Sequence, residues 1–217
     1  YPQDRITAEL EYIAKKAITK DLQITDANFG MFPKDIETAK SIKECQEKYK
    51  GYPQTVLAAT AKTGKERTVE IVKILGPTLP ATAAVQSTDK NVLSEIRRKN
   101  VSQEVLVNFS KSIEKEGGQS EAEIILCLEG DTKEKHFKTV KDMLDADMKF
   151  IRLYQFMMLP GTQSTTTETR NKWQYLCRYR VLPRCFGTYR FRDQKFPVAE
   201  IEEICIANKT MPYEDYQ

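Results

Sequence analysis

The chain has 217 residues and a net charge of +3, with 40% hydrophobic and 30% charged residues. This composition is typical of a globular protein with a substantial core and excludes a disordered chain. No apolar run approaches the roughly 20 residues that span a bilayer, so we predict no membrane span. A pI near 8.5 lies below the ~9 typical of nucleic-acid-binding domains, so we also predict no nucleic-acid partner.

The elements expected along the chain alternate between strands and helices. Strands are predicted at 22–27, 55–60, 82–87, 122–128 and 149–157, and helices at 33–49, 65–75, 89–99, 102–116 and 131–146. Near-continuous apolar strands separated by helices indicate βαβ units and a parallel sheet, with the strands in sequential order. Both an open doubly wound sheet and a complete or partial barrel fit this α/β pattern.

The segment after the repeat is predicted to differ from it. Residues 160–173 are predicted to form a loop that leads into a helix, and residues 200–206 an extra strand. Alternation in that strand predicts that Ile201, Ile204 or Cys205 is buried on one side.

Polar side chains gather where the predicted strands end. The candidates are Asp26 and Asn28, Lys62 and Thr63, Gln86 and Ser87, Glu129 and Asp131, and Gln155. The carboxyl edge of a parallel sheet is where α/β proteins bind ligands, so the repetition indicates a lined pocket. Turn chemistry explains any single one of these ends equally well.

Two common phosphate-binding loops are excluded. "TGKERT" (63–68) lacks the glycine pattern of a P-loop, and "NFGMF" (28–32) carries one glycine only. Nucleotide hydrolysis and ordinary Rossmann chemistry therefore lose support.

Cysteine and histidine usage narrows the chemistry further. The five cysteines, an odd number, are scattered and never spaced C-x-x-C; with no secretory leader in view, this predicts reduced thiols, no metal ligands in this chain and a cytoplasmic location. Cys127 falls in an apolar strand and is predicted to be buried and unreactive. The single histidine, His136, lies in a lysine-rich helix, which predicts a surface position and no histidine-based triad.

Several stretches resemble one enzyme family, and together they cover nearly the whole chain in order. They are "ELEYIAKK" (9–16), "ITDANFGMFPKD" (24–35), "AAVQSTDKNVLSEIRRKN" (83–100), "LYQFMMLPGT" (153–162), "YRVLPRCFGTY" (179–189) and "VAEIEEICIANKTMPYEDY" (198–216). They resemble the radical S-adenosylmethionine (SAM) enzymes, in particular the subgroup that often carries an N-terminal cobalamin-binding domain.

The resemblance implies a partial (β/α)6 TIM-like barrel over residues 1–163, followed by a C-terminal extension over residues 164–217. It implies SAM held against a [4Fe-4S] cluster and reductively cleaved to a 5′-deoxyadenosyl radical. It also implies a cellular electron donor such as flavodoxin or ferredoxin, an unknown substrate and, where a cobalamin domain is present, methyl transfer.

The resemblance also implies cofactor contacts. Asp26 and Asn28 match the position beside the methionine moiety, and Gln86 and Ser87 match the ribose position. Arg98 matches a basic residue that meets the cofactor carboxylate, although a salt bridge on the helix surface explains it as well.

The end of the strand at 122–128 completes this set, because Leu128, Glu129 and Gly130 match the family's adenosine contacts. One feature departs from the family: no Cys-x-x-x-Cys-x-x-Cys cluster loop is present. We expect that loop and the first strand to lie upstream of Tyr1, so the isolated chain is predicted to be inactive. The alternative is a degenerate relative that never binds a cluster.

Two other functions remain open at this point. One is a non-catalytic α/β domain that binds a partner or assembles an oligomer. The other is a barrel hydrolase that uses Asp26 and Glu129 as acid and base, a role that carboxylates at strand ends permit.

Overall fold

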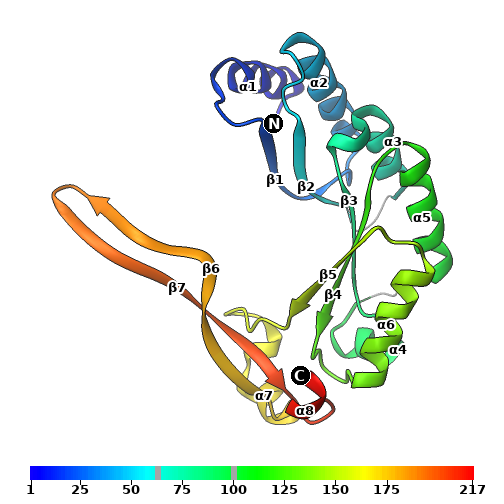
Figure 1. Ribbon diagram of the computed structural model, residues 1–217, viewed down its shortest axis with the longest axis vertical. Helices are drawn as coiled ribbons and strands as arrows, with labels where there is room; N and C mark the ends of the chain where they lie inside the picture. Colours follow the sequence, from blue (N-terminus) through cyan, green and yellow to red (C-terminus); the bar gives the residue numbers. More distant parts are fainter. Residues whose placement is uncertain (62–64, 99–101) are drawn as a thin grey trace. The chain divides into compact units, whose positions relative to one another are not determined.

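The computed structural model describes residues 1–61, 65–98 and 102–217 (Figure 1). Lys62 and Thr63, predicted at a strand end, lie outside these ranges. The chain divides into two compact units. Unit 1 comprises Tyr1–Val85, Val101–Glu123 and Lys141–Arg152, and unit 2 comprises Gln86–Asn100, Ile124–Val140 and Leu153–Gln217.

Unit 1 begins with alternating helices and strands. In chain order these are α1 (Gln3–Lys16), β1 (Asp21–Phe29), α2 (Lys34–Lys48), β2 (Thr55–Thr60), α3 (Lys65–Leu75), the short 3-10 helix η1 (Gly76–Thr78) and, later in the chain, α5 (Gln103–Lys115). β1 and β2 pair in parallel, with Asp21 opposite Thr55. The predicted βαβ unit at 22–60 is therefore confirmed.

Local signals explain why α5 forms. The Ser102 side chain accepts a hydrogen bond from the Val105 backbone N–H at 3.3 Å and caps the helix. Leu106, Phe109 and Ile113, spaced three and four apart, are all buried. A helix with one apolar stripe and a capped start is stable only when that stripe is covered, which the core of unit 1 does.

The remaining strands of the repeat form a second sheet. β3 (Ala81–Gln86), β4 (Ser120–Leu126) and β5 (Phe150–Gln155) lie in that order, and the boundary between the units crosses them. α6 (Lys133–Asp145) connects β4 to β5. The predicted α/β class with parallel sheets and the sequential order within each sheet are confirmed.

Unit 2 carries a long antiparallel hairpin (Figure 1). Its elements are α4 (Lys90–Glu95), η2 (Gln163–Thr165), α7 (Thr167–Trp173), the hairpin strands β6 (Leu176–Phe191) and β7 (Gln194–Ala207), and α8 (Tyr213–Tyr216). Its core packs Val92, Cys127, Leu128, Phe156, Met158, Cys205 and Met211 together. The predicted loop and helix at 160–173 are confirmed, since α7 follows the segment that contains η2.

The predicted extra strand at 200–206 is confirmed but is only the end of β7. Ile204 and Cys205 are buried, whereas Ile201 is 66% exposed. The predicted burial of Ile201, Ile204 or Cys205 is met at Ile204 and Cys205 and not at Ile201, because only the last residues of β7 reach the core of unit 2. The described helices include none long and apolar enough to cross a bilayer.

Candidate functional site

β3 ends in two buried polar residues of unit 2. Gln86 adopts a positive φ of 66°, which is uncommon for a non-glycine residue and often marks a functional site. Its side chain is buried, and its Oε1 has no hydrogen-bond partner in the described part of the chain. Ser87 is also buried, but its Oγ accepts the Asp89 backbone N–H at 3.2 Å. Gln86 is therefore the one of the two with a free acceptor.

The loop after β4 is held from the far end of the sequence. Cys127 also has a positive φ, of 70°. The Asn208 side-chain amide donates to the carbonyl groups of Cys127 at 3.1 Å and Leu128 at 3.2 Å. The carbonyl groups of Cys127 and Leu128 therefore each already accept a hydrogen bond from within the chain.

Glu129 is 4% exposed and has two unlike oxygens. Oε1 accepts hydrogen bonds from the Ser164 hydroxyl at 2.8 Å and the Tyr175 phenol at 2.7 Å. Oε2 is buried without a partner among the described residues. Burial, and then the bond to Glu129, raise the pKa of Tyr175 far above its ordinary 10.0. Tyr175 therefore keeps its proton and donates it.

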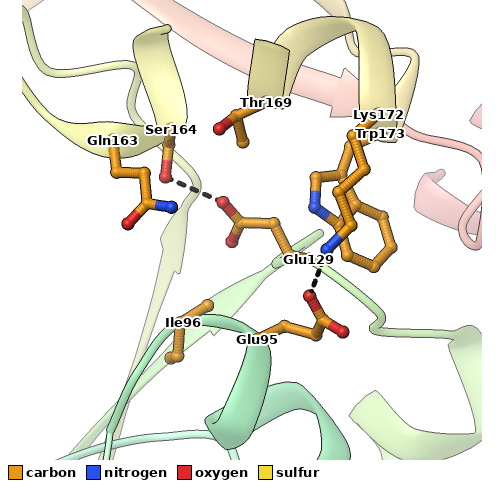
Figure 2. A pocket seen from close by; sticks show the side chains of 8 residues that line it. All are labelled: Glu95, Ile96, Glu129, Gln163, Ser164, Thr169, Lys172 and Trp173. Atoms are coloured by element: carbon orange, nitrogen blue, oxygen red, sulfur yellow. Dashed lines mark hydrogen bonds and ion pairs between the residues drawn. The ribbon is translucent and has the colours of Figure 1, made fainter.

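Glu129 lies on the wall of a cavity of about 130 Å³ within unit 2 (Figure 2). The lining side chains are Glu95, Ile96, Glu129, Gln163, Ser164, Thr169, Lys172 and Trp173. Gly130 lies behind this wall, where an added Cβ would stand 3.6 Å from the Trp173 ring. The α7 segment, which sequence reasoning left as a loop and helix, thus supplies much of the cavity; a polar run ending in a tryptophan was the available signal.

Arg98 lies half-buried in the turn after α4, where its backbone N–H donates to the Leu93 carbonyl at 2.8 Å. It belongs to unit 2, as do Gln86, Ser87, Leu128, Glu129 and Gly130. Six of the eight residues predicted to contact the cofactor are therefore in one unit.

Asp26 and Asn28 belong to unit 1 and lie within β1, which runs to Phe29. The strand predicted at about 22–27 is therefore confirmed and extends two residues further, to Phe29. Asp26 Oδ1 accepts the Asn28 backbone N–H at 2.7 Å, a local bond typical of turns, and the β1–β2 register shifts between Ile24 and Phe29. This irregular stretch keeps the Asp26 side chain exposed.

Two residues that sequence reasoning missed organise the chain after β1. Asp35 is buried and its Oδ2 accepts the backbone N–H groups of Gly30 at 2.9 Å and Phe32 at 3.0 Å. Arg67 donates to the carbonyl groups of Gly30 at 3.1 Å and Met31 at 2.8 Å. An acidic residue in the first turn of α2, two positions after Pro33, was the available signal.

The thiol and imidazole predictions have different outcomes. Cys127 is fully buried, as predicted, although it follows β4 by one residue and its Sγ lies 3.8 Å from that of Cys205. The predicted surface position of His136 is wrong: its side chain is 14% exposed, and Nδ1 lies 3.3 Å from Oδ2 of the buried Asp131. Among the described residues, no group of three or more His, Cys, Asp or Glu side chains is placed to hold a metal ion.

Comparison with characterised proteins identifies two relatives. The chain is 30% identical over 176 residues to the 2-(S-pantetheinyl)-carbapenam-3-carboxylate methyltransferase of Streptantibioticus cattleyicolor, and equally to the cobalamin-dependent radical SAM methyltransferase TokK of Streptomyces tokunonensis. Each match covers 77% of this chain and 25% of the relative. No protein-family profile matches the chain.

Solved structures show the same fold at lower identity. The radical SAM methyltransferase TsrM of Kitasatospora setae, with cobalamin and a [4Fe-4S] cluster bound, has a TM-score of 0.62 at 14% identity, over 86% of this chain and 34% of that one. TsrM with tryptophan and a SAM analogue gives 0.58, over 72% and 30%. The chain is a relative of the cobalamin-dependent radical SAM methyltransferases and spans about a quarter of the length of its curated relatives.

Proposed function

We propose that this chain is part of a cobalamin-dependent radical SAM methyltransferase and forms a partial (β/α)6 barrel with a C-terminal extension. The observation that carries the proposal is the 30% identity to two such methyltransferases over 176 residues. The alternation of parallel strands and helices supports the barrel. The whole protein would be an enzyme whose substrate is unknown.

The residues of unit 2 fit the adenosine part of the cofactor. Gln86 Oε1 and Glu129 Oε2 are buried acceptors without partners among the described residues, one on the last residue of β3 and one after β4. Adenosine carries ribose hydroxyls and an exocyclic amine, which are the donors that such acceptors need. Ser87, Leu128 and Gly130 complete the proposed ribose and adenosine contacts. Asp26 and Asn28 remain proposed for the methionine moiety, and Arg98 for the cofactor carboxylate.

The cofactors supply the reaction when bound: SAM and the [4Fe-4S] cluster supply reductive cleavage, and cobalamin supplies the methyl carrier. The described chain holds its share of the nucleoside and keeps water from it, because the acceptors are buried. We place the three cluster cysteines and the cobalamin domain outside these 217 residues. Reduction would come from a donor such as flavodoxin or ferredoxin in the cytoplasm.

The test uses a protein that includes the cluster loop and the cobalamin domain, reconstituted without oxygen. Gln86→Ala should weaken SAM binding about three- to tenfold, the range expected for one neutral hydrogen bond. Gln103→Ala, an exposed position at the start of α5, is the matched control and should leave affinity unchanged.

Two readouts decide the outcome. Equilibrium SAM binding measures the Gln86 contact, and mass spectrometry of the reaction measures methyl transfer. A reconstituted protein that binds no SAM would contradict the proposal and favour the non-catalytic binding domain.

A further inference from the structure

The cavity beside Glu129 has a buried acceptor that the protein itself does not satisfy. The side chain is 4% exposed, and both of its hydrogen bonds, from Ser164 and Tyr175, reach the same oxygen. In Figure 2, Glu129 lies among the side chains that line the cavity, and its interaction with Ser164 uses one carboxylate oxygen. Oε2 is buried and has no hydrogen-bond partner among the described residues.

The one cationic side chain among the described residues of the lining, Lys172, is already paired with another carboxylate. Lys172 Nζ lies 2.6 Å from Glu95 Oε2 and 4.8 Å from the centre of the Trp173 ring. The lining therefore carries one net negative charge, located on Glu129. A buried carboxylate with only neutral donors is costly, and a cationic donor at Oε2 would remove that cost.

The size and walls of the cavity limit what that donor is. A volume of about 130 Å³ holds roughly four waters at about 30 Å³ each, or one small organic group. Ile96 and the ring of Trp173 provide an apolar wall, while Thr169 and Gln163 add polar atoms. A short alkyl chain ending in a protonated amine matches both the wall and the charge.

We propose that this cavity, formed by Glu129 with the α4 and α7 segments, binds the primary ammonium group of a small ligand or substrate. The ammonium donates to Glu129 Oε2, and its alkyl chain lies against Ile96 and Trp173. Glu129 Oε2 is also the acceptor proposed above for adenosine, so the ammonium ligand and the cofactor would compete for this one oxygen. The experiment therefore includes the cofactor as a separate ligand.

Trp173 is the single tryptophan of the chain and lines the cavity, so its fluorescence reports on binding there. The 217-residue chain is titrated with n-propylammonium at neutral pH and constant ionic strength. 1-Propanol tests the same shape without charge, and tetramethylammonium tests charge without an N–H donor. We expect a saturable change in Trp173 fluorescence with propylammonium. Either comparison compound should bind at least tenfold more weakly.

Glu129→Gln removes the charge and keeps an oxygen for Ser164 and Tyr175, so the fold is retained; circular dichroism checks this. The substitution should weaken propylammonium binding at least tenfold, a loss equivalent to about 1.4 kcal/mol. Glu168→Gln makes the same change on an exposed residue of α7 outside the lining and should have no effect.

Three results would overturn the inference: no saturable response to propylammonium, equal responses to propylammonium and 1-propanol, or equal binding by the wild type and Glu129→Gln. A Glu129-dependent response to SAM or adenosine without one to propylammonium would assign the cavity to the cofactor, which overturns this inference while leaving the proposed function intact.

Discussion

Arg170 and Glu203 form two parallel hydrogen bonds within unit 2, of 2.8 and 2.7 Å, and join α7 to β7. The hydrogen bond from Arg170 lowers the pKa of Glu203 below its ordinary 4.5, against an opposing effect of burial. A group whose pKa is lowered by folding stabilises the protein above its unfolded pKa, and that stability is lost as the pH falls through the folded pKa.

Glu203→Gln should therefore lower the free energy of unfolding by about 1–2 kcal/mol at pH 7, since it removes the charge from a hydrogen-bonded pair. The difference from wild type should shrink as the pH falls below 4.5. Urea unfolding at pH 7 and near pH 3 measures it, with Glu200→Gln, an exposed change on the same strand, as control. An equal loss at both pH values would contradict an ionic contribution.

At the residue scale, the sequence predicts which polar side chains follow the strands but not what they touch. Gln86 and Glu129 are recognisable because β3 and β4 are apolar runs with clear ends. The partners of Glu129 come from residues 35 and 46 positions away, and no local pattern encodes such contacts. The surface position predicted for His136 fails for a different reason: Asp131, five residues earlier, lies against its imidazole, and the side chain is partly buried.

At the element scale, the turn between α5 and β4 requires a residue without a side chain. A Cβ added at Gly118 would lie 2.7 Å from Val72 Cγ1 and 2.9 Å from Ile113 Cγ2. Both neighbours are fully buried core residues of α3 and α5. Close approach between these helices and the turn therefore depends on this glycine.

Gly118→Ala should lower the free energy of unfolding by about 1–3 kcal/mol, the usual cost of overpacking a core. Gly187→Ala is the control, because an added Cβ in that part of β6 has no atom within 4 Å. Thermal unfolding of both variants measures the difference. Equal melting temperatures for the two variants would show that the core relaxes around the added methyl group.

The helices and the strands of the repeat are predictable because their signals are local. Ser102 caps α5, and a three-and-four spacing marks its buried face. The hairpin of β6 and β7 is predicted only at 200–206, because along most of its length both faces are exposed and the strands show no alternation in burial. Its turn at Arg192 and Asp193 also lacks the Asn-Gly pair that announces most two-residue hairpin loops.

At the scale of the whole molecule, the chain corresponds to a quarter of its curated relatives, and the division into 1–163 and 164–217 stays a prediction. Its cysteines are distributed as Cys45 in α2, Cys127 after β4, Cys177 and Cys185 in β6 and Cys205 in β7. A [4Fe-4S] cluster of this kind needs three thiolates from one short segment.

The 217-residue chain alone should therefore assemble no stable cluster during anaerobic reconstitution, and it should bind SAM weakly because the iron contact is missing. Iron and sulfide analysis together with electron paramagnetic resonance measure this. A protein that also carries the cluster loop serves as the positive control. A full cluster on the short chain would contradict the proposed function.

Asn208 has a consequence for the order in which the protein is made. Its amide holds the carbonyl groups of Cys127 and Leu128, about 80 residues earlier in the chain. During translation, the loop that carries Glu129 emerges from the ribosome well before Asn208 does. The loop that forms the cavity wall therefore lacks these two hydrogen bonds until Asn208 has been synthesised. A nascent chain stalled before residue 208 would contain the end of β4 but not the completed site.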